Sequence, residues 1–165
     1  MAPATPYTKY LGDREPLAAL RETSSRIDAL TSGWLPHDYE RTYKPGKWNA
    51  RQILLHLTHL EIACGMRVRM ALTTPSYMVQ PFDQDRWMER ESTVDGRAAA
   101  EAFLALSRLN AALFGTLTAE DMATPVLHPE FGEISVAWII HLLAGHQVSH
   151  LPHFEEIARQ SSAPE

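Results

Sequence analysis

The sequence contains a single cysteine among its 165 residues, Cys64, so no disulfide can form within the chain. Such cysteine usage is typical of a reducing compartment. The sequence also lacks an apolar run approaching the ~18 residues that a membrane-spanning helix needs. Residues 1–10 lack the apolar core of a signal peptide. These absences predict a cytoplasmic protein with no membrane attachment.

Positive charge is scarce as well. The chain carries 15 Lys and Arg against 20 Asp and Glu, for a net charge of −5, and the basic residues are scattered. Nucleic-acid-binding proteins usually have a basic patch, so we expect no nucleic-acid partner. There is no internal repeat, and the length is usual for one domain. We therefore expect residues 1–165 to form one domain that acts on a small molecule.

Four segments have apolar residues at the i, i+3, i+4 and i+7 spacing of an amphipathic helix. The second begins sharply, because Asn49 is a good N-cap and Gln52, three residues later, completes a capping box. The fourth contains Pro152, which removes a backbone hydrogen bond and is expected to kink the helix. The predicted helices cover about residues 16–30, 50–72, 94–117 and 135–160.

The connections between these segments are irregular. Residues 34–48 are rich in turn-forming residues and are predicted to be a loop. Residues 75–93 form a connection long enough to suggest a function, with a candidate short helix over residues 83–90. The segments 126–128 and 132–134 are candidates for a small hairpin. Four helices without a convincing series of strands predict an all-α protein, a four-helix bundle.

Two histidines of the fourth segment, His146 and His150, lie four residues apart in an apolar stretch. On a helix, residues at this spacing share one face, with Cβ atoms about 5–6 Å apart, so two imidazoles can bind one metal ion. His56 has a similar apolar setting on the second segment. Because polar rings that face an apolar core need partners, these three residues are candidate metal ligands.

Other interpretations of these histidines remain open. A core-facing histidine is commonly hydrogen-bonded to a neighbour rather than bound to metal, and the chain lacks the His-Glu-x-x-His signature of many metalloproteases. His59 and His153 flank the proposed site and are rival ligands, whereas His141 points away from it. Cys64 is expected to be a buried apolar group, since no base is adjacent to activate it.

Three stretches of the chain resemble DinB/YfiT-like proteins. The sequence WNARQILLHL, from Trp48 to Leu57, resembles the Trp-Ser-x-x-Glu-hydrophobic-x-x-His-Leu opening of their second helix. The sequence GHQVSHLPHFEEI, from Gly145 to Ile157, resembles their final His-x-x-x-His helix, and residues 85–87 resemble the loop before their third helix. The order of these elements agrees over about residues 16–159. The chain departs from the family in having Asn49 for the frequent Ser and Pro152-His153 for Ala-Gln.

The resemblance implies a four-helix bundle with a divalent metal held by His56, His146 and His150. It also implies a homodimer, and relatives that include thiol-dependent transferases and a mycothiol-dependent isomerase. Three imidazoles leave an open position, as in catalytic zinc sites. We therefore expect Zn, with Ni, Fe or Mn as alternatives, and a low-molecular-weight thiol as a possible co-substrate.

The chemistry that such a site allows depends on what fills the open position. A metal-activated water gives hydrolysis, and a metal-ionised thiol gives thiol transfer. No general base stands out: Gln52 does not titrate, Glu61 points away, and Asp83, Asp85 and Glu89 lie on a connection from which they could reach in. The leading hypothesis is a metal-dependent thiol transferase or hydrolase. The alternatives are a non-enzymatic metal- or ligand-binding dimeric module and a metal-free bundle with packed histidines.

Overall fold

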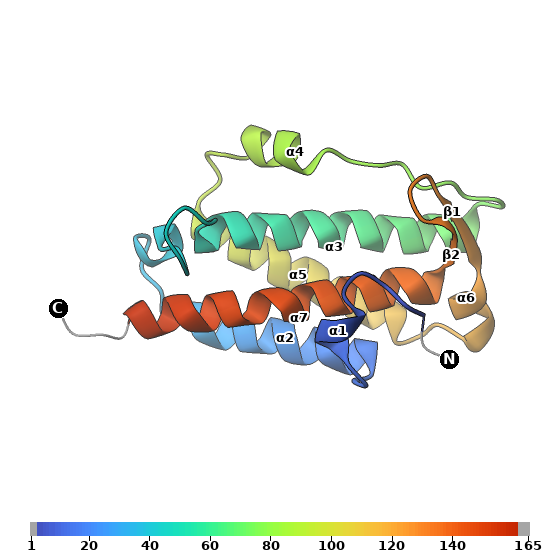
Figure 1. The fold of residues 1–165 in the computed structure, drawn as a ribbon, viewed down its shortest axis with the longest axis horizontal. Coiled ribbons are helices and arrows are strands. Elements are labelled where there is room, and N and C mark those ends of the chain that lie inside the picture. Colours follow the sequence, from blue (N-terminus) through green and yellow to red (C-terminus); the bar gives the residue numbers. More distant parts are fainter. Residues whose placement is uncertain (1–2, 162–165) are drawn as a thin grey trace.

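Four long helices form the body of the protein in the computed structural model, which describes residues 3–161. Helix α3 packs against α5 and α7, and α2 packs against the same two helices, so the four enclose one core (Figure 1). This arrangement confirms the predicted all-α four-helix bundle. The bundle helices are α2 (Pro16–Thr31), α3 (Ala50–Thr73), α5 (Gly96–Phe114) and α7 (Val136–Ser161).

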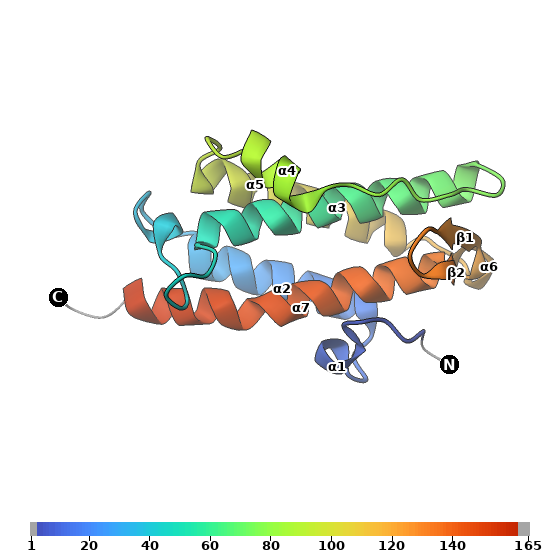
Figure 2. The same ribbon diagram turned by 45° about the horizontal axis from the view of Figure 1, so that its top comes forward.

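The long connection between α3 and α5 follows from the directions of these helices. Figures 1 and 2 show that α3 and α5 run the same way, opposite to α2 and α7. Since α3 has 24 residues, the chain must return about 36 Å, at 1.5 Å per residue, before α5 can begin beside it. Residues 74–95 make this return and include the short helix α4 (Gln84–Arg90), which lies over α3. The predicted short helix at 83–90 is confirmed.

The predicted hairpin lies at the end of the bundle where α3 ends and α7 begins (Figure 1). Strands β1 (Pro125–His128) and β2 (Gly132–Ser135) are antiparallel, with Val126 opposite Ile134. The hairpin also fixes the start of the returning connection, because the Val79 N–H donates to the Leu127 carbonyl at 2.8 Å. Three further short helices were not predicted from the sequence. They are α1 (Thr8–Leu11), the 3-10 helix η1 (Asp38–Glu40) and α6 (Ala119–Ala123).

The boundaries of the long helices have local causes. The predicted capping box is present: Asn49 Oδ1 accepts from the Gln52 N–H at 2.9 Å, and Gln52 Oε1 accepts from the Asn49 N–H at 3.0 Å. Helix α5 is shorter than the predicted 94–117: it starts later because the Asp95 side chain caps it, and it ends at Phe114. Helix α7 continues unbroken through Pro152, which is exposed. No helix among residues 3–161 is long and apolar enough to cross a membrane.

The core consists of apolar side chains from all four long helices, including Ile27, Leu54, Phe103 and Phe154, each fully buried. Cys64 lies in this core, and burial raises the pKa of its thiol to about 12. The thiol therefore remains protonated and serves as a packing group, as predicted.

Candidate metal centre

The three candidate histidines lie together between α3 and α7. One possible ligand atom from each of His56, His146 and His150 lies within 4.8 Å of the other two. The Nε2 atoms of His56 and His146 are 3.0 Å apart. The ring centroid of His56 lies 5.2 Å from that of His150. The structure thus brings together all three residues that the sequence singled out.

Helix geometry explains the arrangement. His146 and His150 are one turn apart on α7, and their rings stack with centroids 5.2 Å apart and planes at 19°. Because α3 packs against α7, the His56 ring lies between these two helices and contacts the rings of both His146 and His150. His56 is buried, and the other two rings are half-buried.

Burial keeps these rings uncharged. It lowers the pKa of His146 to about 2 and that of His150 to about 3, with repulsion from neighbouring histidines adding to both shifts. Burial also lowers the pKa of His56, although the hydrogen bond to Gln84 opposes this. Neutral imidazoles carry the nitrogen lone pairs that a metal needs. A tetrahedral zinc with Zn–N bonds of 2.0–2.1 Å places its ligand nitrogens ~3.3 Å apart, so a small adjustment of this cluster would fit one ion.

His56 is held by a residue that the sequence did not reveal. Its Nδ1 lies 2.9 Å from Gln84 Oε1 on α4. The Gln84 Nε2 lies 3.0 Å from Nδ1 of His59, and His59 Nε2 lies 2.9 Å from Glu91 Oε2. His59 therefore stands behind His56 and is separated from the cluster by Gln84. The only sequence signal for Gln84 was the unusual length of the connection between α3 and α5, which suggested that this segment has a function.

His146 and His150 are each supported by an aromatic or histidine ring. Tyr7 stacks on His146 with ring centroids 4.0 Å apart. The close approach depends on Gly145, because a Cβ atom there would lie 2.7 Å from the Tyr7 carbonyl oxygen. The Nδ1 of His150 lies 3.2 Å from Nδ1 of His153. His153 thus orients His150 rather than joining the three-histidine cluster.

The acidic residues considered as general bases lie elsewhere. Asp83 caps α4 by accepting from the Arg86 N–H at 3.1 Å, and Asp85 and Glu89 are exposed. Glu61 is buried in the core, where Asn110 and Gln147 donate to its carboxylate. Within residues 3–161, the three histidine rings contact other rings and one amide, with no direct carboxylate contact.

A cavity of about 360 Å³ adjoins the cluster. His150 and His153 form one wall, and the ring of Trp48 also lies 5.1 Å from that of His56. The cavity therefore gives a small molecule a path to the histidines. Its lining residues are Tyr43, Gly46, Lys47, Trp48, Ile53, His150 and His153.

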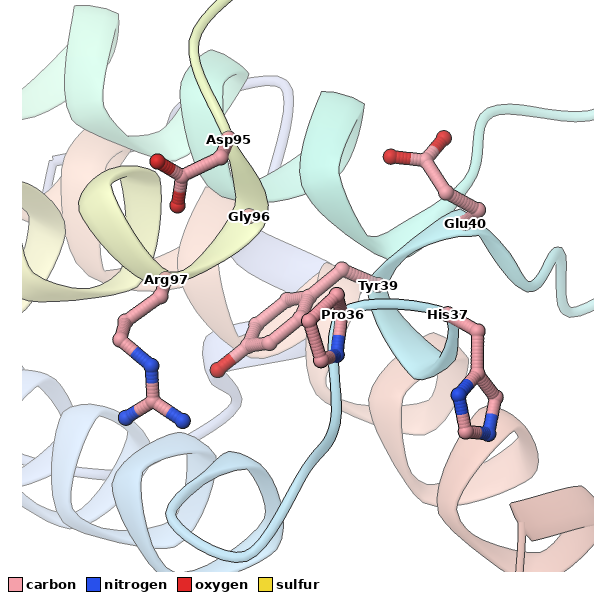
Figure 3. Close-up of a pocket in the computed structure, with 7 residues that line it drawn as sticks. All are labelled: Pro36, His37, Tyr39, Glu40, Asp95, Gly96 and Arg97. Atoms are coloured by element: carbon pink, nitrogen blue, oxygen red, sulfur yellow. The ribbon is translucent and has the colours of Figure 1, made fainter.

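A larger cavity of about 470 Å³ lies between η1 and the start of α5 (Figure 3). Its polar groups are already engaged: Asp95 caps α5, Tyr39 donates to the Thr31 carbonyl, and Glu40 accepts from Asn49 and Arg51. It contains none of the three histidines, so it is a less suitable candidate for the reaction site. It is lined by Pro36, His37, Tyr39, Glu40, Asp95, Gly96 and Arg97.

Comparison with known proteins identifies a family for this chain, and a relative of similar sequence agrees with it. Residues 19–153 match the DinB superfamily. The sequence is similar to "Putative metal-dependent hydrolase OB0413" of Oceanobacillus iheyensis, with 26% identity over 140 residues, 84% of this chain and 81% of the relative.

Two solved structures share the fold. One is YfiT from Bacillus subtilis, described as a probable metal-dependent hydrolase with an unusual four-helix bundle topology. Its TM-score is 0.78 at 21% identity, covering 99% of this chain and 93% of that one. The other is a mycothiol-dependent maleylpyruvate isomerase, with a TM-score of 0.69 at 14% identity, covering 91% of this chain and 61% of the isomerase.

Proposed function

The chain belongs to the DinB superfamily, and from this premise we propose that it is a metal-dependent enzyme whose ion is held by His56, His146 and His150. The observation that carries the proposal is the convergence of three neutral imidazoles within 4.8 Å. Zinc is the ion we favour; Ni²⁺, Fe²⁺ and Mn²⁺ are the alternatives, because imidazole suits all of them.

Three protein ligands leave one position of a tetrahedral ion open, the pattern of catalytic rather than structural sites. When bound, such an ion lowers the pKa of a water or thiol in that position. This effect removes the need for a neighbouring carboxylate base, which the cluster lacks. We propose hydrolysis or thiol transfer as the reaction, the latter with a low-molecular-weight thiol as co-substrate. The hydrolase relatives and the mycothiol-dependent structural neighbour support these two classes.

The adjoining cavity suggests the kind of substrate. Its walls include the apolar surfaces of Tyr43, Trp48 and Ile53, and Lys47 is the one Lys or Arg in the lining, which has no Asp or Glu. Three neutral ligands leave the full positive charge on the ion. Both features favour a compact substrate with an apolar body and an anionic group.

The test begins with protein purified without a histidine tag. We expect one equivalent of divalent metal in the wild type and its loss in His56→Ala and His150→Ala. The matched control is His37→Ala, because His37 has a 65% exposed side chain outside the cluster. Metal that stays stoichiometric in His56→Ala would contradict the site.

Turnover is then measured in the metal-loaded protein. One panel combines thiols with electrophiles, and the other contains esters and amides. Activity with only one panel identifies the reaction class. If the wild type is no faster than His150→Ala on either, the protein is instead a non-enzymatic metal- or ligand-binding module.

We also propose that the protein is a homodimer. Helix α3 exposes Ile62, Met66 and Met70, which lie four residues apart along one face. Leu109 of the neighbouring α5 is 57% exposed. Such apolar groups are suited to contact a second copy, and sedimentation equilibrium measures whether they do.

A further inference from the structure

A line of hydrogen bonds runs from the edge of the protein to the histidine cluster. It passes from Glu91 through His59 and Gln84 to His56, with successive distances of 2.9, 3.0 and 2.9 Å. We call Glu91, His59 and Gln84 the His56 relay. Its members come from the returning connection and from α3, so the relay exists only in the folded protein.

With a neutral His59 ring, the direction of every bond follows from the Glu91 carboxylate. Glu91, when ionised, only accepts, so His59 must donate to it from Nε2. A neutral His59 then has a lone pair on Nδ1, which accepts from the amide nitrogen of Gln84. That orientation of the amide leaves its oxygen facing His56, and this oxygen accepts from the His56 Nδ1–H. With a neutral His59, the opposite orientation of Gln84 would require His59 to donate from Nδ1 and would put its Nε2 lone pair against the Glu91 carboxylate.

The middle of the relay is protected from competing water, whereas Glu91 at its outer end is partly exposed. His59 is fully buried, and the Trp87 ring stands edge-on to it with centroids 5.2 Å apart. Phe82 packs against Trp87 in turn, with centroids 4.6 Å apart. These aromatic rings flank Gln84 in the sequence, so their packing keeps the start of α4 over the two histidines.

We propose that the His56 relay holds His56 as its Nδ1–H tautomer, with the Nε2 lone pair directed at His146 and His150. Gln84, His59 and Glu91 are positioning residues in this proposal, because none of them belongs to the three-histidine cluster. The consequence for metal affinity rests on the proposed function, but the tautomer itself belongs to the metal-free protein and can be measured there. Groups that orient metal-binding histidines typically change metal affinity 10–100-fold.

The first experiment is long-range ¹H–¹⁵N NMR of metal-free protein labelled with ¹⁵N-histidine, which distinguishes Nδ1–H from Nε2–H rings. We expect His56 to be the Nδ1–H form and His59 the Nε2–H form in the wild type. Gln84→Ala should release His56 into a mixture of forms, whereas Gln84→Glu keeps the acceptor and should preserve the Nδ1–H form. A wild-type His56 protonated on Nε2 would overturn the proposal.

The second experiment measures zinc affinity by competition with a chelator. We expect a 10–100-fold loss in Gln84→Ala and a smaller loss in Glu91→Gln, which acts through two intervening residues. The controls are Gln80→Ala and Glu89→Gln, exposed residues of the same connection that contact none of these histidines.

The outcomes of the two experiments separate the two claims. Zinc affinity and His56 tautomer both unchanged in Gln84→Ala would refute the relay and leave the proposed function intact. An Nδ1–H His56 in a protein that binds none of Zn²⁺, Ni²⁺, Fe²⁺ and Mn²⁺ would refute the proposed function and leave the tautomer assignment intact. Circular dichroism of each variant checks that the fold is retained.

Discussion

At the scale of single residues, the main feature is that His146 and His150 remain neutral at pH values far below the usual pKa of histidine. Burial is the largest cause of both lowered pKa values. A metal at this site competes little with protons at neutral pH, because its ligands are already deprotonated. The cluster therefore does not have to lose protons when it binds an ion at neutral pH.

The same shifts predict how the metal-free protein responds to acid. Histidines in the unfolded chain bind protons as the pH falls below their pKa of about 6.5. In the folded protein the pKa is lowered to about 2 for His146 and about 3 for His150, so these rings stay neutral. The unfolded state thus binds more protons, and the free energy of unfolding falls as the pH drops below about 6.5. The loss is at most about 2 kcal/mol per histidine at pH 5.

Chemical denaturation at pH 7 and pH 5 measures this loss. His146→Asn should reduce the difference between the two pH values, since it removes one of the three cluster histidines whose pKa is lowered. A difference as large in this variant as in the wild type would contradict the assignment to the cluster.

The sequence predicts the cluster residues better than the residues that hold them. The pairing of His146 with His150 depends only on helical spacing and on which face is apolar, and the resemblance to DinB/YfiT-like proteins adds His56 to them. Gln84 and Glu91 belong to the connection between α3 and α5. Their positions depend on the path that this segment takes over α3, which no local pattern determines. Tyr7 is similar, because it reaches His146 from a part of the chain 139 positions away.

At the scale of elements, the connection formed by residues 74–95 between the parallel helices α3 and α5 determines features of both the fold and the site. The long helices could be predicted because their apolar periodicity and caps agree. Their order around the bundle could not, because α3 pairs with both α5 and α7 through contacts distant in sequence. The length of residues 74–95 is explained by the distance the chain must cross, and α4 lies on this path above His56 and His59.

The contact between the N-terminal segment and α7 gives an element-scale prediction. Replacing glycine by alanine inside a helix normally stabilises it by about 1 kcal/mol. At Gly145 the added Cβ would lie 2.7 Å from the Tyr7 carbonyl oxygen and 2.8 Å from Tyr7 Cβ. We therefore expect Gly145→Ala to destabilise the protein by about 1–3 kcal/mol, the usual cost of overpacking, and to move Tyr7 off His146.

Urea denaturation measures the sign of the change. Tyr7→Ala removes the stacking ring but leaves the Tyr7 backbone in place, so it serves as the comparison for lost stacking alone. A gain of stability in Gly145→Ala would show that the N-terminal segment does not pack closely on α7.

At the scale of the whole molecule, the three histidines join elements that are distant in sequence. His56 lies on α3, whereas His146 and His150 lie 90 or more positions later on α7. An ion bound to all three would link the two helices in the folded state, and the unfolded chain offers no equivalent site. Metal binding to the proposed site would therefore be coupled to folding, so we expect the ion to stabilise the entire bundle.

The size of this coupling can be stated in advance. Free zinc at 100 times its Kd adds about 2.7 kcal/mol to the free energy of unfolding. For a protein of about 150–250 residues, each kcal/mol raises Tm by about 2–4 °C, so we expect an increase of about 5–11 °C. Thermal unfolding with zinc and after chelation measures it. His37→Ala should retain the increase because that side chain is exposed outside the cluster, whereas His56→Ala should abolish it because α3 then contributes no ligand. An equal increase in both variants would place the bound zinc somewhere other than between α3 and α7.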